Sequence, residues 1–529
     1  MPRRRWSRWV SVVLAPLVLL LGACADTGST STAEDTRHDA AFRPGPVGGE
    51  EPVGEPAQGG QLRIADYYEP PTLDPLRLVA TGSSGGNPLI AIYGTLTRYD
   101  HESGAFAPYM AETLTPSDDF TTWKLNLREG VSFTDGTAYD AAAVKASIDR
   151  FTELGGFTAE LLQEEIKRIR VAGPRELVFE LNRPWGTFDS LLATEVGMIP
   201  APASYAQEQF KPIGAGPFAF DAYAPSESLT LVANANYWEG APHLDSVRFE
   251  WHPDDTTKME TLDAGQVDLA FVRDIKVVGD RMDDYRGYTT MLNGANTLMV
   301  NQREGRPGHD PRVLQAIGHA IDRDILYSRV FGSDEFAGGG LFVKSSRWFN
   351  GTEAPEHDPA RAKQLIEEAK KDGFDGKITY LGGTGTLAET QYVTVKGMLE
   401  QVGLDVEGEF LASPAERYQR LQIANDFDLA WGSLGMPDEM VYLRLRSNVE
   451  NGATGYVNPE MDELLDRLQA ATDDESRSAL TAEVEELWSQ TLPMIRVGGA
   501  PVFTAWSDEV RGVQVTTEHM LMLQHAWLD

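Results

Sequence analysis

Hydrophobic positions change their spacing along this chain, and the spacing predicts which segments are strands and which are helices. Residues 61–68 form an apolar-rich segment followed by a proline-rich breaker, which is typical of a strand and the turn after it. Residues 121–133 alternate apolar and polar positions, with Trp123, Leu125 and Leu127 on one side. This alternation predicts a strand with one buried face.

Two segments combine a helical apolar period with clear start signals. In residues 310–326, Asp310 can cap the first turn, and Pro311 suits the first helical position because its missing N–H is not needed there. Residues 358–373 repeat this design, beginning with Asp358 and ending at a glycine. Both segments are therefore predicted to be amphipathic helices.

Strands and helices also alternate, which indicates an α/β fold. A further helix is predicted to begin at Thr137, where Thr137 and Asp140 can form a capping box. Later in the chain, a strand at 377–382, a helix at 388–403 and a strand at 404–410 follow one another. This order predicts two parallel strands with a right-handed crossover.

The N-terminus has the pattern of an export signal. Four arginines within the first eight residues precede an apolar run at residues 9–21, which is too short to span a bilayer, since spanning needs ~20 residues. Small residues then lead to Cys24, and the sequence Leu-Gly-Ala-Cys at 21–24 resembles a bacterial lipobox. We expect residues 1–23 to be a lipoprotein signal peptide and Cys24 to be lipidated. A buried structural cysteine is the alternative, and the choice between general and twin-arginine export stays open.

Composition changes the picture in three ways. Residues 24–60 are rich in Ser, Thr, Gly, Pro and Glu without an apolar period, which predicts a lipid-anchored, disordered linker. The formal charge is −34, and loss of residues 1–23 with their four arginines makes it −38, so the surface repels nucleic acid and anionic lipid headgroups. One cysteine in 529 residues excludes an internal disulfide, so stability must come from burial in two to four domains.

Sequence motifs of the common enzyme classes are absent. The chain contains no His-Glu-x-x-His, no Gly-x-Ser-x-Gly and no Walker loop, and its nine histidines are scattered. We therefore expect no catalytic residue, no metal site and no cofactor. A glycine-rich turn at 383–388 has dinucleotide-binding spacing, but a lone match of this kind is typical of a plain tight turn.

Several long motifs occur in the order found in one known family. They are the segments 72–75, 92–100, 106–151, 212–251, 262–271 and 310–326, and the C-terminal tail from residue 508. Together they resemble the extracellular solute-binding proteins of the peptide/nickel class, family 5, which serve ABC importers. The resemblance runs from about residue 61 to the C-terminus. Gly214 and Gly216 within it suit a place where two backbones approach closely.

The resemblance implies a periplasmic-binding-protein-like type II α/β fold, with two lobes that close on a solute at a hinge. The order of the motifs places the discontinuous first lobe at 61–100, 213–300 and 495–529. An extra subdomain of that lobe would fill 101–212, and the second lobe would fill 301–494.

The resemblance also implies where the ligand lies. The loop after the first Leu-Asp-Pro segment makes Thr81 and Ser83 candidate ligand-binding residues. The second loop holds Trp431, a stacking candidate for which a core role is equally open. In peptide receptors of the family an Asp three residues after this Trp pairs with the ligand's amine, but that position here is Leu434, so only Asp438 is available as a substitute.

The expected function is capture of a solute at the outer face of the cell membrane and its delivery to an ABC permease. An oligopeptide or dipeptide is the first ligand hypothesis, and an oligosaccharide or another polar metabolite is the alternative, supported by the missing Asp. Nickel is disfavoured because the histidines are scattered. A sensory solute-binding protein would share the same fold. We expect a monomer that binds no nucleic acid and contacts the membrane only through Cys24.

Overall fold

The computed structural model of the chain describes residues 44–49 and 54–529, apart from positions 102, 156, 253, 414, 415, 418, 434–439 and 448–453. These residues belong to one compact unit, 41–529. Cys24, Leu434 and Asp438 lie outside the described residues. Within the described part, no helix combines the length and the apolar character that crossing a membrane requires.

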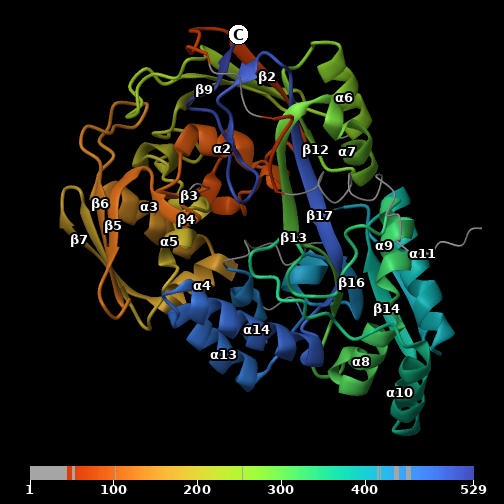
Figure 1. Ribbon diagram of the computed structural model, residues 1–529. Coiled ribbons are helices and arrows are strands. Elements are labelled where there is room, and N and C mark those ends of the chain that lie inside the picture. The colour runs from red at the N-terminus through yellow and green to blue at the C-terminus, as the bar shows by residue number, and fades with distance from the viewer. Residues whose placement is uncertain are drawn as a thin grey trace, which may run out of the picture. The chain divides into compact units, whose positions relative to one another are not determined.

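An eleven-stranded mixed sheet organises the described residues, as Figure 1 shows. Its order is β15-β14-β16-β13-β17-β12-β2-β11-β10-β9, with β1 paired to β13. The strands are β1 Gly45–Val47, β2 Gln61–Asp66, β9 Phe218–Ala224, β10 Ser228–Ala233, β11 Ser246–Trp251, β12 Leu269–Val272, β13 Arg286–Val300, β14 Lys377–Gly382, β15 Asp405–Phe410, β16 Leu429–Gly432 and β17 Ile495–Trp506. The predicted parallel pairing of β14 and β15 around a helix is confirmed.

The two longest strands, β13 and β17, run side by side through the middle of this sheet (Figure 1). Every residue of β17 is buried, which explains its nearly continuous apolar character. The antiparallel register of the pair shifts between Leu292 and Asn296. β13 also pairs with two strands other than β17. Residues 287–289, before the shift, pair with β1, and residues 297–300, after it, pair with β16.

A separate four-stranded sheet has the order β5-β6-β8-β7. Its strands are β5 Ala111–Pro116, β6 Thr122–Leu127, β7 Ile166–Gly173 and β8 Glu176–Leu181, and a short hairpin, β3 Thr97–Asp100 with β4 Ala105–Pro108, precedes it. The predicted alternation is confirmed in β6, where Trp123, Leu125 and Leu127 are buried. Trp123 packs against the ring of Phe188 at a centroid distance of 5.7 Å.

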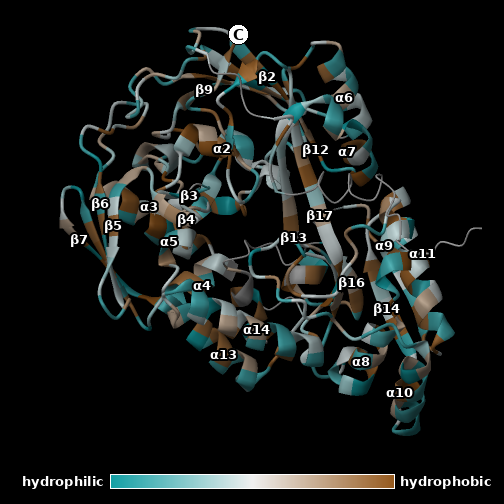
Figure 2. Cartoon of the chain, in the orientation of Figure 1, coloured by the Kyte–Doolittle hydropathy of each residue, from teal (hydrophilic) through white to brown (hydrophobic). Residues whose placement is uncertain are grey.

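The helices cover the sheets with their apolar faces. They are α2 Gly86–Tyr93, α3 Ala141–Leu154, α4 Phe157–Glu165, α5 Phe188–Leu191, α6 Asp255–Asp263, α7 Ile275–Arg281, α8 Pro311–Ala320, α9 Arg323–Phe331, α10 Pro359–Lys371, α11 Thr386–Gln401, α13 Pro459–Ala470 and α14 Asp474–Thr491. Figure 2 shows hydrophilic and hydrophobic residues mixed on α10, α13 and α14. In α10 the buried positions are Ala362, Leu365, Ile366 and Ala369, which form one stripe. Short two-stranded pairs, β18 Val510–Arg511 with β21 Trp527–Leu528 and β19 Gln514–Val515 with β20 Leu521–Met522, complete the C-terminus.

Two helix starts are confirmed and one is corrected. Asp310 and Asp358 cap α8 and α10, each with a proline directly after the cap. The helix predicted to begin at Thr137 begins instead at Ala141, and Asp140 is its cap, accepting from the N–H of Ala143. The prediction was wrong because Thr137 belongs to the preceding turn, where its hydroxyl donates to Asp135.

The helix predicted over 310–326 is divided in two. α8 ends at Ala320, and Asp322 caps a new helix, α9, by accepting from the N–H of Ile325. Asp322 therefore breaks the predicted helix, because its side chain caps a new helix instead of continuing the first one. The division lets α9 turn so that Leu326 and Tyr327 reach the same core as α8.

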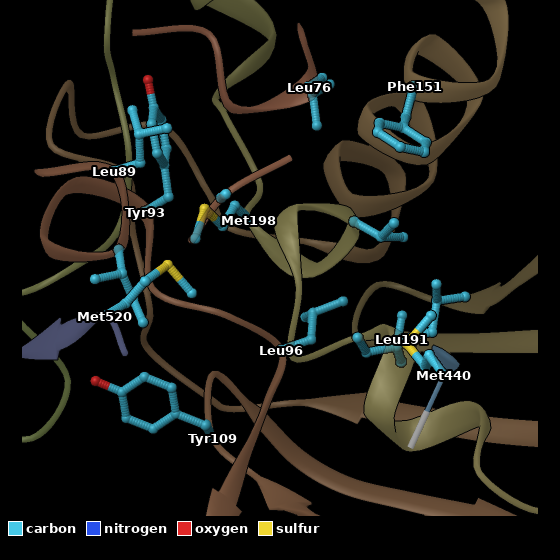
Figure 3. Packing of buried hydrophobic residues seen from close by; sticks show 14 of the residues in the cluster. Leu76, Leu89, Tyr93, Leu96, Tyr109, Phe151, Leu191, Met198, Met440 and Met520 are labelled. Atoms are coloured by element: carbon cyan, nitrogen blue, oxygen red, sulfur yellow. The ribbon is translucent and has the colours of Figure 1, made fainter. Parts of the chain in front are cut away.

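Three clusters of buried side chains form the core. Figure 3 shows part of the largest, where Tyr93, Met198 and Leu96 gather with residues from distant segments such as Met520. The predicted close approach at the two glycines is confirmed, because a Cβ atom at Gly214 would lie 2.0 Å from the carbonyl oxygen of Ile92. At Gly216 it would lie 2.6 Å from a carbonyl oxygen.

The disordered linker predicted for residues 24–60 is corrected in one place. Residues 45–47 form β1, which pairs antiparallel with residues 287–289 of β13. Val47 packs against the third core cluster. The composition of the segment did not predict this strand, because the strand is stabilised by backbone pairing with the edge of β13 rather than by an apolar pattern of its own.

Candidate ligand-binding site

A cavity of about 480 Å³ lies against the middle of β13. Further lining comes from the segments 81–83, 99–101, 343–347 and 516–518 and from the single residues Pro44, Arg273 and Ser433. Its lining residues are Pro44, Thr81, Ser83, Tyr99, His101, Arg273, Tyr288, Thr290, Met291, Leu292, Gly294, Ala295, Val343, Ser345, Ser346, Arg347, Ser433, Thr516, Thr517 and Glu518. The volume is within the range of small-ligand sites, ~300–1,000 Å³.

Thr81 and Ser83, both expected at the ligand, are brought together at this cavity. Their loop is rigidly held, because the N–H of Thr81 donates to Ser84 Oγ at 2.9 Å and the N–H of Gly82 donates to the carbonyl of Glu518 at 2.9 Å. The Ser83 hydroxyl oxygen is buried and has no hydrogen-bond partner among the described residues. An unpaired buried hydroxyl costs free energy unless a ligand group satisfies it.

Two threonine hydroxyl groups, one on β13 and one on β17, contact the ring of His519. Thr290 Oγ1 lies 2.6 Å from His519 Nδ1, and Thr504 Oγ1 lies 2.8 Å from His519 Nε2. Burial, together with the positive charge of Arg273, lowers the pKa of His519 to about 3. His519 is therefore neutral at physiological pH. Burial raises the pKa of Tyr288 to about 12, so its hydroxyl is protonated, and it lies 3.4 Å from His101 Nδ1.

Charged side chains at the cavity come from distant parts of the chain. Arg273 follows β12, Arg347 lies in the loop before α10, and Glu518 lies near the C-terminus. The Arg347 guanidinium lies 4.2 Å from the ring centroid of Trp348 and 4.0 Å from a carboxylate oxygen of Asp474. A cavity with cationic, anionic and hydroxyl groups suits a polar, charged solute.

Trp431 lies in the core rather than at the cavity. Its side chain is 7% exposed and belongs to the second core cluster, where its ring meets that of Phe331 at 6.2 Å. Its backbone pairs with Leu298 in the main sheet. Of the two roles left open for Trp431, the packing favours the core.

Leu434 and Asp438 lie outside the described residues. Ser433, directly before them, lines the cavity and donates a hydrogen bond to the carbonyl of Gly294 at 2.9 Å. Ser433 of the predicted second loop therefore lies at the cavity wall.

Sequence reasoning missed Arg273, the cavity residues of β13 and the loops at 343–347 and 516–518. A signal existed for Arg273, because it is a charged residue directly after a buried strand, where binding residues often lie. The other segments carry no local signal, since only the fold brings them to one place. Among the described residues, no group of three or more His, Cys, Asp or Glu side chains could hold a metal ion.

An α/β scaffold with a polar cavity against the centre of its main sheet defines a protein that binds a small solute. The model of the bacterial extracellular solute-binding proteins, family 5 Middle, matches residues 105–452. This match covers more than half of the chain, so the chain belongs to that family, and the expectation of a family 5 solute-binding protein of an ABC importer is confirmed.

Known relatives agree with this assignment. The glutathione-binding protein GsiB of Shigella dysenteriae is 25% identical over 426 residues, which is 76% of this chain and 82% of GsiB. The solved oligopeptide-binding protein AppA of Bacillus subtilis, in complex with a nonapeptide, has a TM-score of 0.74 at 21% identity and covers 90% of this chain and 100% of AppA. DppA of Helicobacter pylori, in complex with the peptide STSA, has a TM-score of 0.74 at 21% identity, covering 89% and 98%. The predicted type II fold is thereby confirmed.

Proposed function

We propose that this chain captures a short peptide outside the cell membrane and delivers it to the permease of an ABC importer. The observation that carries this proposal is the cavity of about 480 Å³, where the held loop of Thr81 and Ser83 faces the middle of β13. Its polar lining suits the amide groups of a peptide. The relative GsiB, named for a tripeptide ligand, supports a peptide over a sugar.

Within this proposal Thr81 and Ser83 bind the ligand's polar groups, and Asp438 is the candidate partner for its amine. The Leu434 position then supplies no charge. Binding involves no catalytic step, which agrees with a family of solute-binding proteins.

The division into lobes belongs to the same proposal. We assign 61–100, 213–300 and 495–529 to one lobe, 301–494 to the other, and 101–212 to an extra subdomain. The strand order supports this, because β14, β15 and β16 lie on one side of the β13–β17 pair and β12, β2, β11, β10 and β9 lie on the other. The register shift in the β13–β17 pair, beside the cavity, is then the natural hinge.

Calorimetric titration of the purified full chain with di- to hexapeptides and with oligosaccharides of similar size tests the function. We expect saturable binding of one length class of peptide, together with a rise in melting temperature, because a ligand of the folded state stabilises it by mass action. Binding of a sugar with no response to any peptide would overturn the peptide assignment.

A further inference from the structure

Arg273 is a cation at the cavity without an anionic partner in the described part of the chain. It is half-buried and directly follows β12. Its Nε atom is buried and has no hydrogen-bond acceptor among the described residues. Its guanidinium carbon lies 5.1 Å from the ring centroid of Tyr67, a contact that orients the side chain but does not neutralise it.

The carboxylate that contacts the backbone of Arg273 is paired with another cation. Asp255 Oδ1 accepts from Lys258 Nζ at 2.7 Å, and Asp255 Oδ2 accepts from the backbone N–H groups of Arg273 and Asp274 at 2.6 Å each. Asp255 therefore matches the buried ammonium of Lys258 and fixes the backbone of Arg273. The Arg273 guanidinium is left to face the cavity.

The loop that carries Ser83 packs against the same end of β12. Beside Ser83, a Cβ atom at Gly82 would lie 2.0 Å from the carbonyl oxygen of His519 and 2.9 Å from the ring of Phe271, which is two residues before Arg273. Phe271 and His519 also contact each other edge-on, with ring centroids 5.2 Å apart. The unpaired hydroxyl of Ser83 and the unpaired guanidinium of Arg273 thus stand on adjoining walls of one cavity.

We propose that Arg273 and Ser83 form an anion subsite that receives a carboxylate of the bound solute. A guanidinium presents two parallel N–H groups that match a carboxylate, and a serine hydroxyl can donate a third bond. This inference rests on the proposed peptide function, and it narrows the ligand to a peptide whose carboxylate enters the subsite. Either the C-terminal carboxylate or an acidic side chain has the required chemistry.

Calorimetric titration of the full chain with matched tripeptides distinguishes these two sources. The probes are trialanine and its C-terminal amide, and alanyl-glutamyl-alanine beside alanyl-glutaminyl-alanine. In the wild-type chain, loss of the recognised carboxylate should weaken binding ~10- to 100-fold, the value expected for hydrogen bonds to a charged group. Whichever pair shows the difference identifies the carboxylate.

Variants of the chain then test the residues themselves. Arg273→Gln should abolish the difference between the acid and the amide, and Arg273→Lys should keep part of it because the charge remains without the planar fork. Arg281→Gln is the matched control, since Arg281 lies nearby on α7 but is ion-paired with Asp263 and is not among the cavity-lining residues. Ser83→Ala, a small change that preserves the loop, should reduce the discrimination ~3- to 10-fold.

Thermal unfolding without ligand shows whether each variant is folded. Equal binding of acid and amide by the wild-type chain, or full discrimination in folded Arg273→Gln, overturns the subsite but leaves the peptide function standing. If no tripeptide binds, the same acid and amide pairs are made in the peptide length that does bind, and failure of every di- to hexapeptide to bind overturns both. If Arg273→Gln does not fold, the Ser83→Ala result decides, and unchanged discrimination in that variant overturns the subsite.

Discussion

Gly82 and His519 touch so closely that no side chain fits between them, because a Cβ atom at position 82 would lie 2.0 Å from the His519 carbonyl oxygen. This contact joins the loop of Thr81 and Ser83 to the C-terminal segment of the chain. It therefore limits how far the loop with these two ligand-binding candidates can move.

Gly82→Ala should therefore displace the loop, weaken peptide binding by at least tenfold and lower the free energy of unfolding by about 1–3 kcal/mol, as overpacking does. Titration and denaturant unfolding measure the two effects. Gly338→Ala is the control, since a Cβ atom there meets nothing within 4 Å. Equal behaviour of the two variants would contradict the tight contact.

Glu195 predicts a pH dependence of stability. It is buried and accepts from the N–H of Ala80, and burial raises its pKa to about 7. The folded chain then binds more protons at this site than the unfolded chain between pH ~4.5 and 7. Its contribution to stability is complete below pH ~4.5 and is lost as the pH rises to 7, by up to about 3 kcal/mol.

Glu195→Gln should lose less stability than the wild-type chain over this pH range, because the amide does not ionise and still accepts from Ala80. Urea unfolding at several pH values measures the difference in the free energy of unfolding between the variant and the wild-type chain. Glu129→Gln, at an exposed carboxylate, should follow the wild-type profile. Parallel profiles for all three proteins would show that Glu195 does not titrate in this window.

The buried pair of Lys258 and Asp255 is expected to be essential as a pair. Asp255→Ala leaves the Lys258 ammonium without its carboxylate and should cost about 3–5 kcal/mol of the free energy of unfolding. Adding Lys258→Met should recover a large part of that loss, because the unpaired charge is removed. A double variant as unstable as the single one would assign the cost to the lost backbone contacts of Asp255 instead.

Cys24 is expected to hold the chain at the membrane. If Cys24 is the lipidation site that the sequence predicts, Cys24→Ser should move the protein from the membrane fraction to the soluble fraction, because serine has no thiol for the lipid. Ala25→Ser, one residue on, is the matched control and should stay with the membrane. Cell fractionation with immunoblotting reads the outcome, and membrane retention of Cys24→Ser would contradict the anchor.

The features that could be predicted from the sequence are those that depend on residues close together in the chain. The caps at Asp310 and Asp358 and the alternation through Trp123 depend on residues within one turn or one strand, so their patterns were sufficient. The role of Trp431 was not decidable in this way, because a large aromatic residue has the same local pattern in a core and at a ligand. Arg273 and Ser83 are far apart in the chain, and tertiary contacts such as the packing of Phe271 against His519 bring them to one cavity.

The pairing of β1 with β13 has a practical consequence for any shortened form of the protein. Composition suggests cutting the chain at residue 60, where the low-complexity segment ends. Such a cut would remove the strand that covers residues 287–289 and leave the backbone groups of a central strand open at an edge. Open strand edges are where chains join into aggregates, so a protein prepared from residue 44 onward should remain monodisperse where one prepared from residue 61 does not.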